Sequence, residues 1–179
     1  MKQLNVLICI GSLVLTAFSG FTLQATADEP AQTKYEFVVV GNEAFGDLVS
    51  RGEYQLAIER INGRPKAYPF ATATNLCVSF SMIGQLDRAA TQCDEALKQA
   101  EASSLPGPKR WNTRQQLATS WAIAYSNRGV FRALSGDLSG AAADFQMAVE
   151  HEAKMNAPTR NFARVQMKPT VPAVASLSH

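Results

Sequence analysis

Few residues in this chain of 179 have the type and spacing that catalysis or metal binding requires. The two histidines are His151 and His179, and His151 lies between Glu150 and Glu152, adjacent charged positions that point to different faces of a helix. The sequence contains no G-x-S-x-G nucleophile elbow and no glycine-rich phosphate loop. We therefore expect no enzyme activity, no metal site and no cofactor. The alternative is a hydrolase, whose site would have to assemble from residues that no motif marks.

Composition excludes a nucleic-acid partner. The formal net charge is +2, and 18% of the residues are charged. Proteins that bind nucleic acid usually carry a strong basic excess, or aromatic and basic side chains on one face for stacking bases, and the sequence indicates neither. The length and the 46% hydrophobic content suit one globular domain.

The first 27 residues have the order of a secretory signal peptide. Lys2 precedes a mostly apolar run at residues 4–18, and small residues then lead to a cleavage site after Ala27. An uncleaved membrane anchor is the alternative, but the run is shorter than the roughly 20 apolar residues that span a bilayer. We expect an exported protein, periplasmic by default or extracellular, with no membrane association after cleavage.

Two cysteines, Cys77 and Cys93, would remain after cleavage. An even number of cysteines in an oxidising compartment favours a disulfide. Each lies eight residues from Gln85, near the turn between two expected helices, so they lie level on antiparallel neighbours. The alternative is two free cysteines that act as small buried hydrophobic residues. Their separation does not fit the C-x-x-C redox motif.

Three segments of the chain share one pattern. Each begins with a glycine, at Gly52, Gly84 or Gly136, and continues into a helix whose apolar and small residues are spaced by three, four and seven. Another apolar helix precedes each glycine. Gly129, before the last of these glycines, and Ala141, after it, are small residues placed where the two helices would touch.

A glycine turn between two helices, with alanine at the close contacts, resembles the tetratricopeptide-repeat (TPR) family, whose period is about 34 residues. The resemblance covers residues 41–155 and is strongest in the last unit. Its matching residues there are Tyr125, Asn127, Arg128, Gly129, Gly136, Asp137, Ala141, Phe145 and Ala148. The middle unit has Cys77 where glycine is usual and Cys93 where an aromatic residue is usual. The resemblance implies an all-α fold, a right-handed α-solenoid of about three helix-turn-helix repeats.

The expected organisation is a signal peptide at residues 1–27, an extended lead-in at residues 28–41, a TPR-like repeat domain with a capping helix at residues 42–167, and a disordered tail at residues 168–179. Residues 35–40, the β-like run, have no partner strand, so we interpret them as extended chain or a frayed first turn. Asn42 is then a plausible N-cap.

Two later stretches depart from the repeat pattern. Residues 101–117 exceed the repeat period. A loop at residues 103–108 leads into one long expected helix at residues 109–134, whose first turns either cap the core or project as a lip beside a binding face. We expect the last repeat helix to run to Met155, where Pro158 breaks it. A short capping helix then holds Phe162 and Val165, with Arg160 before Phe162 and Arg164 between the two.

The resemblance also implies where a partner binds. First helices line the hollow side of a solenoid, and Asn75 and Asn127 occupy matching positions on them, where their amides can hydrogen-bond a partner's backbone. Arg128 and Arg132, one turn apart, can hold a carboxylate. The alternative is that Asn127 bonds the neighbouring helix while Arg128 lies along the surface.

These features favour a non-enzymatic interaction module, an exported adaptor that binds a peptide or protein partner. The alternative is a small structural or self-associating envelope protein, such as a homodimer, because a short solenoid leaves apolar surface at its ends.

Overall fold

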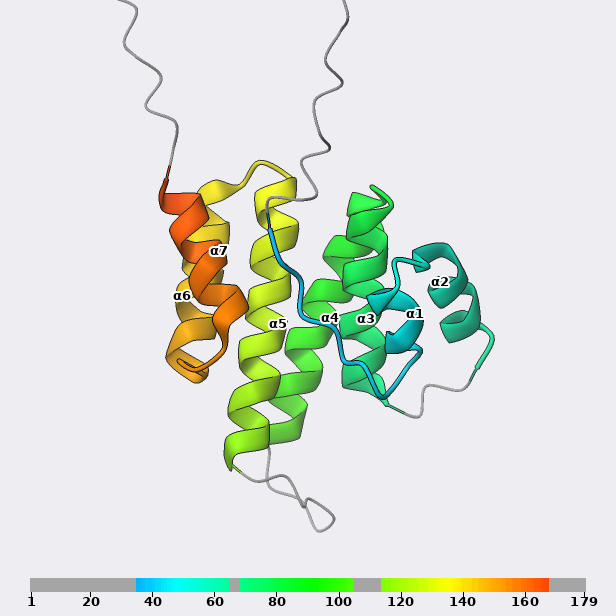
Figure 1. The fold of residues 1–179 in the computed structure, drawn as a ribbon. Helices are drawn as coiled ribbons and strands as arrows, with labels where there is room; N and C mark the ends of the chain where they lie inside the picture. The colour runs from blue at the N-terminus through cyan, green and yellow to red at the C-terminus, as the bar shows by residue number, and fades with distance from the viewer. Residues whose placement is uncertain (1–34, 65–67, 105–113, 168–179) are drawn as a thin grey trace, which may run out of the picture.

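The computed structural model describes residues 35–64, 68–104 and 114–167, and all regular secondary structure in these ranges is α-helical (Figure 1). The expected all-α fold is confirmed. The expected signal peptide and the expected tail lie outside the described residues. The helices of the described ranges are α1 (Gly46–Ser50), α2 (Tyr54–Asn62), α3 (Pro69–Met82), α4 (Leu86–Ser104), α5 (Arg114–Leu134), α6 (Leu138–His151) and α7 (Asn156–Gln166).

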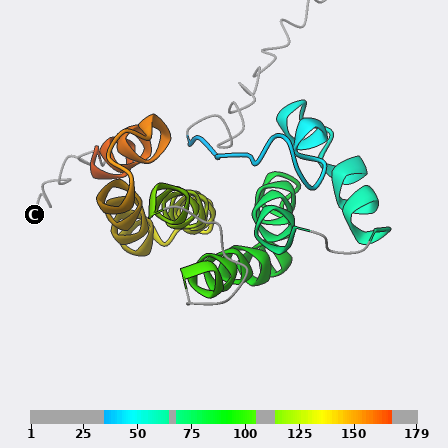
Figure 2. The same cartoon turned by 90° about the horizontal axis from the view of Figure 1, so that it is seen from below.

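The helices pack in a repeating order. α1 packs on α2, α3 on α4 and α5 on α6, while α3, α5 and α7 each pack on the helix just before them. In addition, α1 contacts α3, α3 contacts α5 and α5 contacts α7. The odd-numbered helices therefore form a continuous row, and Figure 2 shows the whole set as an arc.

Three glycines end the first helix of each pair in the same way. Gly52, Gly84 and Gly136 have φ angles of 79°, 75° and 86°, a region open to glycine and strained for other residues. After each glycine, the next residue donates its N–H to a carbonyl oxygen in the last turn of the helix, as in a Schellman motif. The donor and acceptor pairs are Glu53 and Leu48, Gln85 and Phe80, and Asp137 and Arg132. The three glycines are thus structurally equivalent.

Small residues make the contacts within each pair of helices. Ala57, Ala89 and Ala141 each lie five residues after a turn glycine and have no exposed surface. Gly129 faces the ring of Phe145, where an added Cβ would lie only 2.6 Å from Cε1. Glycine at position 129 leaves room for this ring, so α5 and α6 can pack closely around it.

Residues 35–40, which we call the crossing segment, run in extended form across the open side of the arc (Figures 1 and 2). The segment forms no helical turn. Tyr35, Phe37 and Val39 pack against the buried clusters of the helices. Successive side chains of an extended chain point to opposite sides, so Glu36 and Val38 lie on the other side of the backbone.

Several predicted boundaries are wrong. Asn42 does not cap a helix, because residues 41–45 form turns and α1 begins only after Phe45. α6 ends at His151 and not at Met155. Pro158 does not separate two helices but lies in the first turn of α7, where a missing N–H breaks no helical hydrogen bond.

The described part of the insertion at residues 101–117 lengthens two helices. α4 continues through Ser104, two residues into the loop expected at 103–108, and α5 begins at Arg114. Residues 105–113 lie outside the described residues. The side-chain amide of Gln115 donates a hydrogen bond to Glu152, after the end of α6. This contact favours the capping interpretation for the added turn of α5.

Candidate functional site

Three buried asparagines bind the backbone of the crossing segment at every second residue. In each pair the asparagine Oδ1 accepts the backbone N–H of a residue, and its Nδ2 donates to the carbonyl oxygen of that same residue. The pairs are Asn161 with Glu36 (2.9 and 2.8 Å), Asn127 with Val38 (2.8 and 2.7 Å) and Asn75 with Val40 (3.1 and 3.1 Å). We call these three side chains the asparagine ladder.

The ladder matches the geometry of an extended chain. The N–H and C=O of one residue in a strand point to the same edge, and the pattern recurs at every second residue. An asparagine amide offers one acceptor and one donor group side by side, as a neighbouring strand would. α7, α5 and α3 each supply one asparagine, and all three are at most 1% exposed. The ladder therefore replaces a partner strand and recognises backbone atoms.

Asn75 also holds the turn that follows the crossing segment. Its Nδ2 lies 3.0 Å from the carbonyl oxygen of Glu43 and 3.3 Å from that of Ala44. Both Ala44 and Phe45 have positive φ angles, 47° and 57°. This backbone region disfavours residues that have a Cβ, so the turn is strained.

Asn75 and Asn127 lie on the row of odd-numbered helices, as expected from the sequence, and Asn127 does not bond a neighbouring helix. The backbone that they hold here belongs to this chain. The sequence interpretation missed Asn161, although it follows Asn127 by 34 residues, the period of the repeat family. It was missed because α7 has no glycine turn after it and was interpreted only as a cap.

A charged group lies at the α7 end of the ladder. The Glu36 carboxylate accepts hydrogen bonds from Nε of Arg160 at 2.8 Å and from Nη1 of Arg164 at 2.9 Å. The hydrogen bond from Arg160, assisted by Arg164 against the effect of partial burial, lowers the pKa of Glu36 to about 2. Arg164 also donates to Oδ1 of Asn161 at 3.2 Å, which links the charged group to the ladder.

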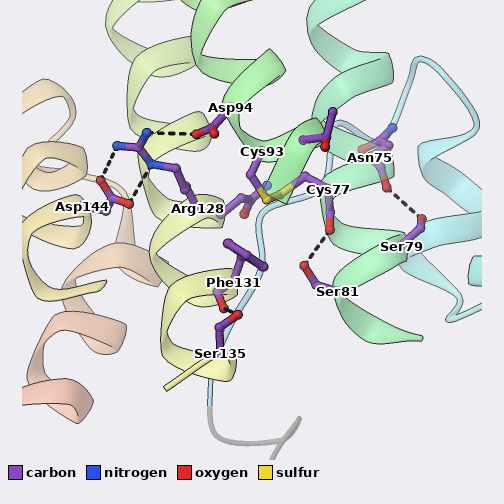
Figure 3. The surroundings of a disulfide bond; sticks show 12 residues. Asn75, Cys77, Ser79, Ser81, Cys93, Asp94, Arg128, Phe131, Ser135 and Asp144 are labelled. Atoms are coloured by element: carbon purple, nitrogen blue, oxygen red, sulfur yellow. Dashed lines mark hydrogen bonds and ion pairs between the residues drawn. A yellow bond between two sulfur atoms is a disulfide. The ribbon is translucent and has the colours of Figure 1, made fainter. Parts of the chain in front are cut away.

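Arg128 and Arg132 hold a carboxylate, but that carboxylate comes from α6. Asp144, with a side chain 3% exposed, accepts from Nη2 of Arg128 at 2.7 Å and lies 2.9 Å from Nη1 of Arg132. Arg128 also reaches Asp94 on α4 at 3.2 Å (Figure 3). Burial opposes the charge of Arg128, yet the hydrogen bonds and charges of Asp144 and Asp94 raise its pKa. These arginines connect α4, α5 and α6 and do not join the ladder.

Cys77 and Cys93 form a disulfide between α3 and α4, with Cα atoms 4.8 Å apart (Figure 3). Both residues are fully buried. When positions are counted along the sequence from the turn glycine, Cys77 corresponds to Gly129 in the next pair of helices, and Cys93 corresponds to Phe145. The bond therefore has a packing role, and neither cysteine offers a free thiol.

The described ranges also contain an aromatic cluster and a cavity beside the turn that follows the crossing segment. His151 stacks on Trp121 and Tyr125, with ring centroids 5.6 and 5.7 Å away, so it belongs to an aromatic cluster. A cavity of about 430 Å³ lies beside the turn at residues 41–45. The described residues contain no group of three His, Cys, Asp or Glu side chains placed to hold a metal ion. None of their helices is both long and apolar enough to cross a bilayer.

Comparison with known proteins adds no assignment. No protein-family model matches the chain. A search of curated proteins finds no match, and neither does a search of solved structures.

Proposed function

We propose that this protein is a non-enzymatic interaction module that binds an extended peptide segment of a protein partner along α3, α5 and α7. The asparagine ladder carries this proposal, because three buried amides on successive odd-numbered helices bind an extended backbone at alternate residues. We call the surface that the ladder lines the ladder face. Recognition of the backbone there uses side-chain hydrogen bonds and requires no cofactor.

We further propose a TPR-like right-handed α-solenoid as the architecture. The three equivalent glycine turns support it, as does the regular order of helix contacts.

An exported, periplasmic or extracellular location is also part of the proposal. The Cys77–Cys93 disulfide supports it, since such bonds persist in oxidising compartments.

The proposal requires that a partner can replace the crossing segment. Two observations support this exchange. The hydrogen bonds between the ladder and the segment go to backbone atoms, so a different extended sequence can satisfy the same hydrogen bonds. The turn that connects the segment to α1 is strained at Ala44 and Phe45, by roughly 1 kcal/mol or more for each residue in the left-handed region. Release of the segment relieves that strain.

The same strain favours a second candidate, self-association. Two copies can exchange their crossing segments, so that each ladder binds residues 35–40 of the other copy with unchanged contacts. Light scattering of the mature protein over a range of concentrations separates the candidates. A concentration-dependent dimer favours exchange between copies, and a monomer at all concentrations favours a different partner.

Peptide competition tests the main proposal. Val38→Pro in the full chain removes the N–H that donates to Asn127, which weakens the crossing segment on its own ladder. Val38→Ala is the matched control, because it keeps this N–H at a position whose side chain belongs to neither buried cluster. We expect a labelled peptide with the sequence of residues 35–40 to bind the Val38→Pro protein about tenfold more tightly than the control protein, from one lost hydrogen bond.

The result that would overturn the proposal is equally specific. If the Val38→Pro protein keeps its helical circular dichroism but binds no peptide at any concentration tested, the ladder face is not a peptide-binding surface. The crossing segment would then be a fixed part of the fold.

A further inference from the structure

The ladder recognises any extended backbone, so selectivity must come from side chains. This inference rests on the proposed function. We propose that the ladder face selects extended peptides in which an acidic residue lies between two apolar residues and a third apolar residue follows two positions later. The acidic side chain binds between Arg160 and Arg164 of α7.

Charge complementarity at α7 carries the acidic position. Within the described ranges, Glu36 is the carboxylate paired with Arg160 and also the one paired with Arg164. When the crossing segment leaves, two guanidinium groups four residues apart on one helix lose their shared counter-charge. Like charges at this spacing repel each other. A ligand that supplies a carboxylate restores the pairing, and a neutral ligand does not.

The arginines act on the ladder as well as on the charge. Arg164 donates to Oδ1 of Asn161, the atom that also accepts the N–H of Glu36. A carboxylate that binds Arg164 therefore orients the asparagine that binds the ligand's own backbone. The acidic residue must consequently occupy the position of Glu36, and not any other position along the segment.

The apolar positions follow from the alternation of side chains. The ring of Tyr35 stacks near Phe145, with centroids 6.4 Å apart. Phe37 packs against two buried clusters, and Val39 packs against one of them. Val38 belongs to neither cluster and shares a side with Glu36, so its position tolerates other residues.

The polarity of the ligand is set by the same contacts. Its acidic end lies over α7 and its other end lies over α3, because Asn161, Asn127 and Asn75 bind residues 36, 38 and 40 in that order. A peptide with the reversed sequence would place its carboxylate over α3, away from Arg160 and Arg164.

Three labelled peptides test the selectivity on the full-length Val38→Pro protein. The first has the sequence of residues 35–40, the second carries Glu36→Gln, and the third carries Val38→Ser. We expect the glutamine peptide to bind about fivefold to tenfold more weakly at low ionic strength, and this difference to shrink at 1 M salt. We expect the serine peptide to bind within about twofold of the first, since its position contacts no cluster.

A charge exchange provides the second readout. A protein that carries both Arg160→Glu and Arg164→Glu should not bind the first peptide and should bind a peptide that carries Glu36→Lys. Equal binding of the first and the glutamine peptides at low salt would overturn the selectivity and leave peptide binding intact. If none of the peptides binds, the proposed function itself fails.

Discussion

The side-chain amide of Asn127 is paired with both backbone polar groups of Val38, whose N–H lies 2.8 Å from Oδ1 and whose carbonyl oxygen lies 2.7 Å from Nδ2. The two residues are 89 positions apart in the chain, and Asn127 is only 1% exposed. One buried side chain of α5 thus satisfies backbone groups of an extended segment that has no strand beside it among the described residues. This relationship is the centre of the ladder, and the first prediction concerns it.

Asn127→Ala should lower the free energy of unfolding by about 2 kcal/mol, because it leaves one N–H and one carbonyl of Val38 without partners. Asn62→Ala, at an exposed helix end, is the control and should change stability by less than about 0.5 kcal/mol. Urea denaturation measures both. Combined with Val38→Pro, Asn127→Ala should cost clearly less than the sum of the single changes, since both remove the same hydrogen bond. Additive effects would show that the pair is not coupled.

Glu36 should make stability depend on pH in the acid range. Its pKa in the folded protein is about 2, below the value of about 4.3 for an unfolded glutamate. Because the pKa is lower in the folded protein, the Glu36 carboxylate stabilises the fold at pH values above the pKa of the unfolded state. This contribution is lost as the pH falls through about 2. We expect the free energy of unfolding of wild type to exceed that of Glu36→Gln by about 1 kcal/mol at pH 7, after allowance for solvent screening, and by much less near pH 2. A difference that stays constant from pH 7 to pH 2 would contradict the assigned ion pairs.

Arg128 and Arg132 should matter for stability more than for peptide binding. Replacing both by alanine leaves Asp144 buried without a counter-charge, which should cost about 3 kcal/mol. Asp144→Asn should cost less, because the arginines are partly exposed and can regain water. In the Val38→Pro background, Asp144→Asn should leave the affinity for the residue 35–40 peptide unchanged. A large loss of affinity would instead place these arginines at the binding site.

Loss of the disulfide should destabilise the protein without changing its fold. Cys77→Ala with Cys93→Ala opens a loop with a sequence separation of 16, so the free energy of unfolding should fall by about 3 kcal/mol. A reducing agent should lower the stability of wild type by a similar amount and leave the double variant unaffected. If reductant destabilises both proteins equally, the effect does not come from this bond.

Gly129→Ala should destabilise the pair formed by α5 and α6. Its Cβ would lie 2.6 Å from the ring of Phe145, which must move within a packed core at a cost of about 1–3 kcal/mol. Gly41→Ala is the matched control, since nothing lies within 4 Å of its added Cβ. Thermal unfolding followed by circular dichroism measures both changes. A tolerated alanine at position 129 would mean that the two helices can separate without loss.

The features that the sequence predicted well are those with local causes. Gly52, Gly84 and Gly136 each end a helix because only glycine adopts the required φ without strain. Cys77 and Cys93 lie level because a helix rises evenly on both sides of the turn that joins their helices. Local signals failed at Asn42 and Pro158, where one residue type suits two structures. Asparagine suits a turn as well as a helix N-cap, and proline suits the first turn of a helix as well as a helix break.

By itself, the sequence determined a set of glycine-linked α-helices and the places of Asn75 and Asn127 on their shared face. Only the tertiary structure decided what those asparagines bind, and that Asn161 and Glu36 belong to the same site. The physical reason is that the ladder recognises backbone N–H and C=O groups, which every extended residue possesses. Contacts of that kind, between residues 35 to 125 positions apart, leave no pattern of side-chain types to identify them.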